Sequence, residues 1–357
     1  MNYTGAKQKL EEFIIQIDEY LQKYWQEEVS KDFGFNQRQK ELVRKIINHS
    51  GEHNLRQAKR LRASYVYYSY MLGGDKQKIE EVMRAAMAVE LVHTALLMHD
   101  DVMDQDDVRR GKPTTHKYFE EGDAHYGESM AINAGDAVLL LGYELLNRLN
   151  FEPERIIKAQ NQFLRGVTNT AFGQAYDVSL ERYQEWKEDD VLSLHKAKTA
   201  IYTYENPLLI GAYLANLPPD TEQIIHDYSM DGGVAFQLQD DILGVYGNPE
   251  KTGKSANSDL LQGKVTLLIL KTLELGSESE KEAVKKVWGK RRAETTDIEA
   301  AKEAIKTSGA YEYSLVISRD LAHRAAQTAE KLRGLNLNEE AIDYIGGIAE
   351  YMVHRDL

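Results

Sequence analysis

The stretch AAMAVELVHTALLMHDDVMD, residues 85–104, is apolar on all sides over most of its length and becomes acidic at its end. A second stretch, GGVAFQLQDDILG at 232–244, repeats this order of apolar and acidic residues. Helices that are apolar all round are normally surrounded by other helices, so we expect both segments to be central helices of a helical protein. Solvated faces do not normally follow buried helices, and the repeated aspartate pairs therefore point to sites that bind cations.

Helical periodicity also dominates outside these two segments. It predicts helices at about 6–24, 36–72, 76–104, 125–150, 153–182, 187–216, 219–246 and, in several pieces, from 258 to the end. The chain has only six prolines, no convincing strand pattern and no linker that would separate domains. We therefore predict an all-α protein, with residues 1–357 folded as a single-domain helical bundle.

Composition narrows the class of protein. With 28% charged and 42% apolar residues, the chain is typical of soluble proteins. It has no cysteine, which excludes disulfides and thiolate metal sites and suits a cytoplasmic location. The start, MNYTGAKQKLEEFIIQIDEYLQKYW, has the pattern of an amphipathic helix and not of a signal peptide or a transmembrane segment. A formal net charge of −13 argues against nucleic acid as a partner.

The first aspartate pair lies in the run HDDVMDQDDVRRGKPT, residues 99–114. On a helix, Asp100 and Asp104 stack one turn apart with Asp101 beside them, and such like charges need a cation among them. Mg²⁺ is bound by oxygen ligands and typically completes its coordination with substrate phosphates. The basic residues that follow directly are Arg109, Arg110 and Lys112. Carboxylates next to guanidinium groups predict a site for a di- or polyphosphate.

In an acidic protein, local groups of basic residues predict an anion pocket and not a general basic face. The residues concerned are Lys59, Arg60, Arg62, Arg109, Arg110, Lys254 and Lys264. A central hydrophobic pocket between the helices, charged at its mouth and apolar below, would accept a ligand with a phosphate head and a hydrocarbon tail.

These motifs resemble, in type and order, those of the trans-isoprenyl diphosphate synthases, the polyprenyl synthetase family that includes farnesyl and geranylgeranyl diphosphate synthases. The run at 99–114 resembles the first aspartate-rich motif, DDxxDxxxxRRG, and FQLQDDILGVYGNPEKTGKSANSDLLQGKVTLL at 236–268 resembles the second. GQAYD at 173–177 is similar to the GQxxD motif, and AKTA at 197–200 to the KT motif. The resemblance covers nearly the whole chain and implies a helical bundle of the isoprenoid synthase type that forms a homodimer.

The resemblance also implies an activity and a set of site residues. The enzyme would condense isopentenyl diphosphate with dimethylallyl, geranyl or farnesyl diphosphate to give an all-trans prenyl diphosphate, with three Mg²⁺ ions bound alongside the substrates. The implied metal ligands are Asp100, Asp101, Asp104 and Asp240, with Asp241 as a further candidate. The implied ligands of the allylic diphosphate are Arg109, Lys198, Lys254 and Lys264. Those of isopentenyl diphosphate are Lys59, Arg62, His93 and Arg110.

In the implied reaction, metals and cationic side chains stabilise the departing diphosphate. The backbone carbonyl of Lys198, the Thr199 hydroxyl and the Gln237 side chain would stabilise the allylic carbocation. The double bond of isopentenyl diphosphate then attacks, and the released diphosphate takes the proton, because no side chain is an obvious base. Two alternatives remain open. A class I terpene cyclase shares the first motif but needs no isopentenyl diphosphate pocket, and a non-catalytic subunit of a heteromeric synthase tends to lose aspartates.

The chain departs from the family pattern in three places. Members commonly read GGKxxRP where this chain has QAKRLRA at 57–63, which keeps Lys59 and Arg62 but loses both glycines and the proline. Gly244 stands where a third aspartate is common in the second motif, a form that also occurs in enzymes making geranylgeranyl diphosphate. Arg355 is the only arginine in the last twenty residues, which gives little support for a basic tail that closes the site.

Small residues below the first aspartate pair bear on product length. Ala95 lies one to two turns below the metal site, where family members that stop at C15 often have an aromatic floor. Its small side chain predicts a product of C20 or longer. Further candidates that would line the path of the hydrocarbon tail are Val92 and Ala88, with Leu139 and Tyr143 as a deeper floor. In the alternative interpretation, Ala95 simply allows two helices to pack closely.

Overall fold

The computed structural model describes residues 3–180, 182–183, 185–247, 257–290 and 292–354. It divides into two compact units that interleave along the chain. The amino-terminal unit comprises Gln8–Gln160 and Ile210–Leu217, and the carboxy-terminal unit comprises Met1–Lys7, Asn161–Leu209 and Pro218–Leu357. Three of the boundaries fall inside helices, namely α1 (Tyr3–Glu28), α7 (Pro153–Leu180) and α9 (Asn206–Leu214). A single domain over residues 1–357 stays a prediction.

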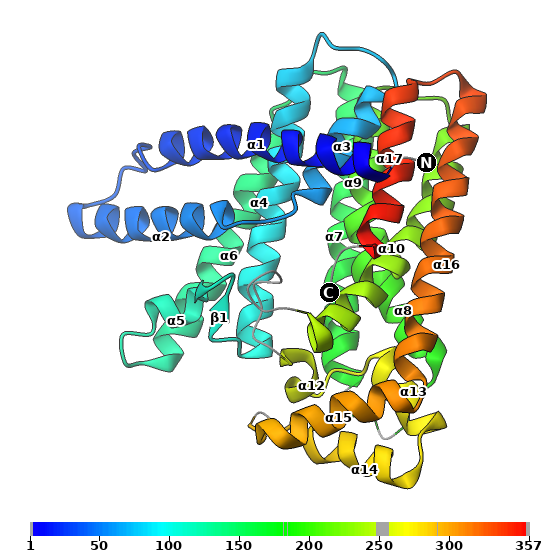
Figure 1. The fold of residues 1–357 in the computed structure, drawn as a ribbon. Coiled ribbons are helices and arrows are strands. Elements are labelled where there is room, and N and C mark those ends of the chain that lie inside the picture. The colour runs from blue at the N-terminus through cyan, green and yellow to red at the C-terminus, as the bar shows by residue number, and fades with distance from the viewer. Residues whose placement is uncertain (1–2, 181, 184, 248–256, 291, 355–357) are drawn as a thin grey trace. The chain divides into compact units, whose positions relative to one another are not determined.

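The described residues confirm the all-α fold (Figure 1). The amino-terminal unit contains most of α1 (Tyr3–Glu28), together with α2 (Gln37–Leu55), α3 (Leu61–Met71), α4 (Ile79–Asp104), β1 (Val108–Arg109), β2 (Lys112–Pro113), α5 (Thr115–Phe119) and α6 (Ala124–Asn147). The carboxy-terminal unit contains α8 (Glu188–His195), the π-helix η1 (Lys196–Glu205), α10 (Asp220–Tyr246), α12 (Ser258–Gln262), α13 (Leu267–Leu275), α14 (Glu278–Val287), α15 (Thr295–Thr307), α16 (Ala310–Glu330), the 3₁₀ segment η2 (Lys331–Leu335) and α17 (Glu339–Val353).

Helix α4 is the core of the amino-terminal unit, as its apolar sequence predicts. It packs against α2, α3, α5 and, most extensively, α6, which runs alongside it (Figure 1). The approach to α6 is close because position 142 is a glycine: a Cβ there would lie 2.6 Å from Cγ2 of Val92 and 2.9 Å from the Ala88 carbonyl oxygen. Small residues on both helices therefore set the distance between their axes.

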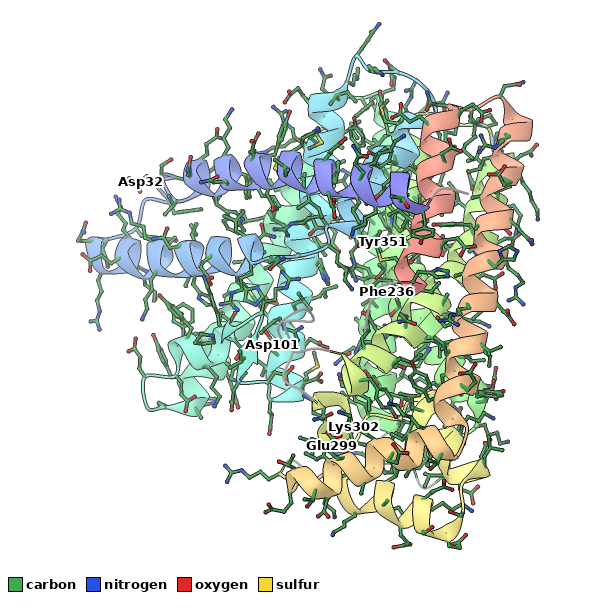
Figure 2. All side chains as sticks on the ribbon, viewed as in Figure 1. Asp32, Asp101, Phe236, Glu299, Lys302 and Tyr351 are labelled. Atoms are coloured by element: carbon green, nitrogen blue, oxygen red, sulfur yellow. The ribbon has the colours of Figure 1, made fainter. Side chains whose placement is uncertain are left out.

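Helix α10 is the core of the carboxy-terminal unit, which confirms the second predicted central helix. It packs against α16, α17 and η1, and Phe236 in its middle is buried (Figure 2). A Cβ on Gly233 would lie 2.3 Å from the Cα of Ala200 on η1, so the two backbones approach closely at this glycine. The acidic ends of α4 and α10 are thus each carried by a buried helix.

Two predicted helices are interrupted in the structure. The segment 36–72 forms α2 and α3, separated by a turn in which Arg60 adopts the left-handed conformation, with a φ of 49°. The segment 187–216 contains α8, η1 and α9, and its middle part is a ten-residue π-helix. π-helical segments are rare and frequently mark functional sites. Hydrophobic periodicity does not distinguish such interruptions from continuous α-helix.

A short hairpin follows α4 and carries the RRG residues. Strands β1 and β2 are antiparallel, with Val108 opposite Pro113 and Arg109 opposite Lys112. The two residues between the strands, Arg110 and Gly111, have φ values of 54° and 73°. Two-residue loops with positive φ at both positions match the right-handed twist of hairpin strands. The RRG sequence is therefore a tight turn, and its glycine meets a backbone requirement.

Two helices, α4 and α6, are long and apolar enough to cross a membrane by length and composition alone. The most apolar window of α4 is 72% buried inside the protein, and that of α6 is 39% buried. Core helices of soluble proteins meet the same criteria, and the burial of α4 fits that class. On α6, Ile132 and Leu140 are exposed. The expected absence of a transmembrane segment stays a prediction.

We expect Gly142→Leu to lower the free energy of unfolding by about 1–3 kcal/mol, because the added side chain meets α4 backbone as well as Val92. Denaturant unfolding followed by circular dichroism measures the effect. Gly334 is the control, since a Cβ there meets no atom within 4 Å, and Gly334→Leu should unfold like the parent. Equal midpoints for the two variants would contradict the close packing of α4 on α6.

Candidate active site

The end of α4 brings the three aspartates of the first motif into two different environments. Asp101, labelled in Figure 2, lies near the end of α4. It is completely buried and forms an ion pair with Nε of Arg109. Asp100 and Asp104 lie one turn apart on α4 and are partly exposed. The helix ends at Gln105, which has a φ of 55°. Asp100 and Asp104 are therefore better placed than Asp101 to meet a ligand from solvent.

Arg109 supplies positive charge among these carboxylates. Besides Asp101, its Nη2 lies 3.7 Å from Oδ2 of Asp100 and 3.5 Å from Oδ2 of Asp106. Burial by itself would lower the pKa of Arg109, but the charges of Asp101 and Asp100 raise it above the usual value. The sequence predicts a cation within this acidic run, and the structure places a guanidinium there.

Arg56, which the sequence analysis missed, holds the hairpin that carries Arg109. It is buried at the end of α2, and its Nη1 and Nη2 donate to the carbonyl oxygens of Arg109 at 3.1 Å and Pro113 at 2.9 Å. Glu52, one turn earlier, accepts from the same guanidinium at 2.8 Å. Arg110 in turn donates to the Arg56 carbonyl oxygen at 3.3 Å. This ladder of hydrogen bonds fixes the backbone of the hairpin against α2.

Two of the predicted isopentenyl diphosphate ligands touch each other. Nη1 of Arg62 lies 3.1 Å from Nε2 of His93. Burial, followed by the charges of Arg62 and Arg110, lowers the pKa of His93 well below its usual value, so the ring is neutral and its Nε2 accepts a hydrogen bond from the guanidinium. Lys59 is exposed just before α3. The three residues belong to the same unit.

The fourth, Arg110, stands at the turn of the hairpin. Burial, followed by the neighbouring charge of Arg60, lowers the pKa of Arg110 to about 10. The charges of Arg109 and Arg62 lower this pKa as well, whereas the charge of Glu90 raises it. An anion pocket at this group of basic residues stays a prediction.

His53 is a second residue that the sequence did not single out. It is buried on α2, and its Nε2 lies 3.7 Å from Oδ2 of Asp101. Burial, followed by the charges of Arg56 and Arg109, lowers the pKa of His53 well below its usual value. The ring is therefore neutral, and it lies near Oδ2 of Asp101, whereas Arg109 pairs with Oδ1. A histidine at this helical position gives no sequence signal of such a contact.

In the carboxy-terminal unit, the GQxxD and KT motifs form one arrangement. Nζ of Lys198 on η1 donates to Oδ2 of Asp177 on α7 at 2.7 Å. A Cβ on Gly173 would lie 3.2 Å from the Lys198 nitrogen, so the glycine lets α7 approach the backbone of η1. The aspartate of one motif thus holds the lysine of the other, and the glycine makes room for the turn that bears it.

Thr199 and Gln237 are in contact. The Thr199 hydroxyl donates to Oε1 of Gln237 at 2.6 Å, and Nε2 of Gln237 donates to Oδ1 of Asp241 at 2.9 Å. Nε2 of His195, which the sequence analysis missed, lies 3.2 Å from Oδ2 of Asp241. Asp241 is buried and orients the Gln237 amide. Asp240, beside it on α10, is partly exposed.

The glycine of the second motif lies against another carboxylate. A Cβ on Gly244 would lie 2.2 Å from Oδ2 of Asp259, a buried residue on α12. Nζ of Lys264 lies 3.8 Å from Oδ1 of Asp259. The backbone N–H of Lys264 donates to the backbone carbonyl oxygen of Asp259 at 3.0 Å. Lys254 and Arg355 lie outside the described residues.

The residues proposed to set product length lie on α4 and α6. Ala95 and Val92 are completely buried, and Val92 and Ala88 are the residues that Gly142 approaches. Close packing of two helices, the alternative interpretation for Ala95, is thus observed at Val92 and Ala88. Leu139 and Tyr143 are partly buried. A role in product length stays a prediction for all of these residues.

The side chains present fit a divalent metal that a substrate helps to hold. Among the residues that the structure describes, no three His, Cys, Asp or Glu side chains are grouped so that they hold an ion by themselves. Mg²⁺ is usually bound through one or two carboxylates together with phosphate oxygens and water. Asp100 and Asp104 at the end of α4, and Asp240 on α10, offer oxygen ligands of this kind.

Comparison with known proteins agrees with these motifs. The sequence model of the polyprenyl synthetase family matches residues 44–305. The chain is similar to the geranylgeranyl diphosphate synthase of Saccharolobus solfataricus, with 33% identity over 83% of this chain and 86% of that protein. It is also similar to the geranylgeranyl diphosphate synthase of Sulfolobus acidocaldarius, with 34% identity over 82% of this chain and 84% of that protein.

A solved structure is similar over nearly the whole length. The geranylgeranyl pyrophosphate synthase of Corynebacterium glutamicum, complexed with isoprenyl diphosphate and magnesium, has a TM-score of 0.87 and 28% identity, covering 98% of this chain and 99% of that one. The family match spans both units described above. From the extent of these similarities and the order of its motifs, the chain belongs to the polyprenyl synthetase family.

Proposed function

We propose that this trans-prenyltransferase condenses isopentenyl diphosphate with an allylic diphosphate, namely dimethylallyl, geranyl or farnesyl diphosphate, to give an all-trans prenyl diphosphate of C20 or longer. The observation that carries the proposal is the contact between Arg62 and His93 beside Arg110, whose pKa burial and Arg60 lower to about 10. This group of basic side chains supports an anion-binding region apart from the carboxylates of α4. A basic region for one diphosphate, together with carboxylates that would bind another through metal, suits two diphosphate substrates.

This basic region separates the proposal from the two alternatives. A class I terpene cyclase ionises one diphosphate and has no use for a second diphosphate pocket. A non-catalytic partner subunit tends to lose aspartates, whereas Asp100, Asp104 and Asp240 are all present and partly exposed. The names of the two archaeal relatives, both geranylgeranyl diphosphate synthases, support a product of C20.

The allylic diphosphate would be bound through the acidic ends of α4 and α10. Asp100, Asp104 and Asp240, with Asp101 and Asp241 as further candidates, would hold up to three Mg²⁺ ions, and magnesium is present in the similar synthase of known structure. When bound, the metal supplies positive charge that neutralises the phosphate oxygens and lowers the barrier to their departure. Arg109, Lys198, Lys254 and Lys264 would add cationic contacts to the same group.

Reaction begins when the C–O bond of the allylic substrate breaks and its electron pair leaves with the diphosphate. The Thr199 hydroxyl, the Gln237 amide oxygen and the Lys198 carbonyl oxygen direct dipoles at the resulting allylic cation. The π electrons of isopentenyl diphosphate form the new C–C bond, and the released diphosphate takes the proton lost from the adduct. Asp241 contributes by holding the Gln237 amide in place. Apolar surroundings keep out water, which would quench the cation.

We further propose a cytoplasmic homodimer without a transmembrane segment. Helix α6 keeps apolar side chains in solvent, with Ile132 47% and Leu140 65% exposed. The two lie eight residues apart, close to one face of the helix. A second copy of the chain that covers this face would remove both side chains from water. If a second copy covers this face, the apolar side chains of α6 are shielded from water without contact with lipid.

Neutralising either acidic site should abolish most of the activity. We expect Asp100→Asn and Asp240→Asn each to lower kcat by on the order of 10²–10³, because each removes a charge that stabilises the departing diphosphate. Turnover is measured at saturating Mg²⁺, with folding checked by circular dichroism. Asp107→Asn is the matched control, since Asp107 is exposed in the same acidic run and pairs with Lys117 at 3.3 Å. Near-parental turnover in both test variants would reject the metal assignment.

The two substrates should respond to different residues. Lys59→Ala or Arg110→Gln is expected to raise the KM for isopentenyl diphosphate more than the KM for the allylic primer, because each removes a charge from one pocket only. Steady-state kinetics with each substrate varied in turn provides the comparison, and Lys45→Ala, which breaks an exposed pair with Glu121, is the control. A rise in the primer KM alone for Lys59→Ala would mean that the pockets are assigned the wrong way round.

Product length should depend on position 95. We expect the parent enzyme to yield C20 or longer, and Ala95→Tyr to shift the product to C15, because the ring would block the path of the hydrocarbon chain. Chromatography of dephosphorylated products gives the lengths. Ala137→Tyr, on the exposed side of α6, controls for the added ring, and Ala95→Met provides a smaller obstacle. A folded Ala95→Tyr enzyme that makes the parental product would show that the chain runs elsewhere.

A further inference from the structure

Arg60 stands between two of the proposed isopentenyl diphosphate ligands in a conformation that an L-residue avoids. It has a φ of 49° and a ψ of 29° and immediately precedes the first residue of α3. Residues other than glycine adopt this left-handed region at a cost, and do so where the surroundings impose it. The left-handed residue is Arg60 itself, whereas Gln57 and Ala58, which stand where the family pattern has glycines, do not have a positive φ. The surroundings of Arg60 must therefore hold the turn.

The side chain of Arg60 supplies that hold. It is buried, and each of its three nitrogens has a partner on a different helix. Nε donates to Oδ1 of Asp18 on α1 at 2.8 Å, Nη1 to Oε2 of Glu90 on α4 at 3.0 Å, and Nη2 to the carbonyl oxygen of Asn54 on α2 at 2.7 Å. A buried guanidinium that lost one of these partners would be left with an unpaired charge, so the arrangement is strongly specified.

Glu90 also fixes the start of α3. Its second oxygen, Oε1, accepts the backbone N–H of Ala63 at 3.2 Å. Ala63 is the third residue of α3, and the first N–H groups of a helix need such acceptors from outside the helix. Glu90 thereby holds the residue after Arg62 as well as Arg60 before it.

The same face of α4 holds Arg62. His93 lies three residues after Glu90, so the two side chains are neighbours on the helix surface. Glu90 binds Arg60 and the Ala63 amide, while His93 contacts Arg62 at 3.1 Å. Glu90 and His93 on α4 therefore bind the turn and the first residues of α3.

We propose that Arg60, Glu90 and Asp18 are positioning residues that aim Lys59 and Arg62 at isopentenyl diphosphate. The three side chains do not contact the substrate themselves. They act by fixing the backbone that carries the two ligands. The inference rests on the proposed function, which assigns Lys59 and Arg62 to this substrate.

Kinetics of Glu90→Gln and Asp18→Asn tests the proposal, since both changes keep shape and remove charge. We expect each to raise the KM for isopentenyl diphosphate about 10-fold while kcat and the primer KM stay within about twofold. Glu81→Gln is the matched control, because Glu81 also lies on α4 and forms an exposed pair with Arg84 at 3.0 Å. Equal rises in both KM values, or none, would overturn the proposal in favour of a purely structural role.

Lys59→Ala, measured alongside, separates this inference from the proposed function. A raised KM for isopentenyl diphosphate in Lys59→Ala but not in Glu90→Gln would leave the pocket in place and overturn the positioning role. No change in Lys59→Ala would reject the pocket itself. If Glu90→Gln does not fold, Asp18→Asn decides, because the Asp18 side chain is 38% exposed and its loss is better tolerated. A parental KM for isopentenyl diphosphate in Asp18→Asn would then overturn the proposal.

Discussion

The buried ion pair between Asp101 and Arg109 joins the acidic end of α4 to the basic hairpin that follows it. Removing one partner of such a pair leaves an unpaired charge and typically costs about 3–5 kcal/mol. The pair therefore fixes the hairpin, and with it Arg110, relative to the other two aspartates of α4. This explains in physical terms why DDxxD and RRG are found in one short run. Asp101 thus positions the Arg109 guanidinium, while Asp100 and Asp104 remain partly exposed and can meet a ligand.

Charge compensation divides the basic residues of the amino-terminal unit into two groups. Arg56 and Arg60 are buried and paired with Glu52 and with Glu90 and Asp18. These arginines hold backbone in place. Arg110 shows the opposite condition, because burial and the nearby charge of Arg60 lower its pKa to about 10. In the proposed function, a diphosphate that bound there would relieve this repulsion.

The sequence predicts those parts of the site that depend on residues close together in the chain, and it misses those that depend on contacts between residues far apart in the chain. Hydrophobic periodicity identifies α4 and α10 because a buried helix marks every turn with apolar residues. Motif order brings Arg62 and His93 together, and the contact is present. The left-handed turn at Arg60, the π-helix around Lys198 and the hairpin are missed, since each depends on partners distant in the sequence. Glu90 is the clearest case: within an apolar helix it gives no local sign that it binds α3.

The second acidic motif shows how such a distant partner changes the meaning of a substitution. Gly244 departs from the aspartate common at this position, which taken alone suggests that the motif has lost a charge. The space next to Gly244 is occupied by the carboxylate of Asp259, whose Oδ2 lies 2.2 Å from where a Cβ would be. A side chain at 244 and the observed place of Asp259 exclude each other. The carboxylate beside α10 therefore comes from α12, where Lys264 lies 3.8 Å away, and the glycine is what allows it to be there.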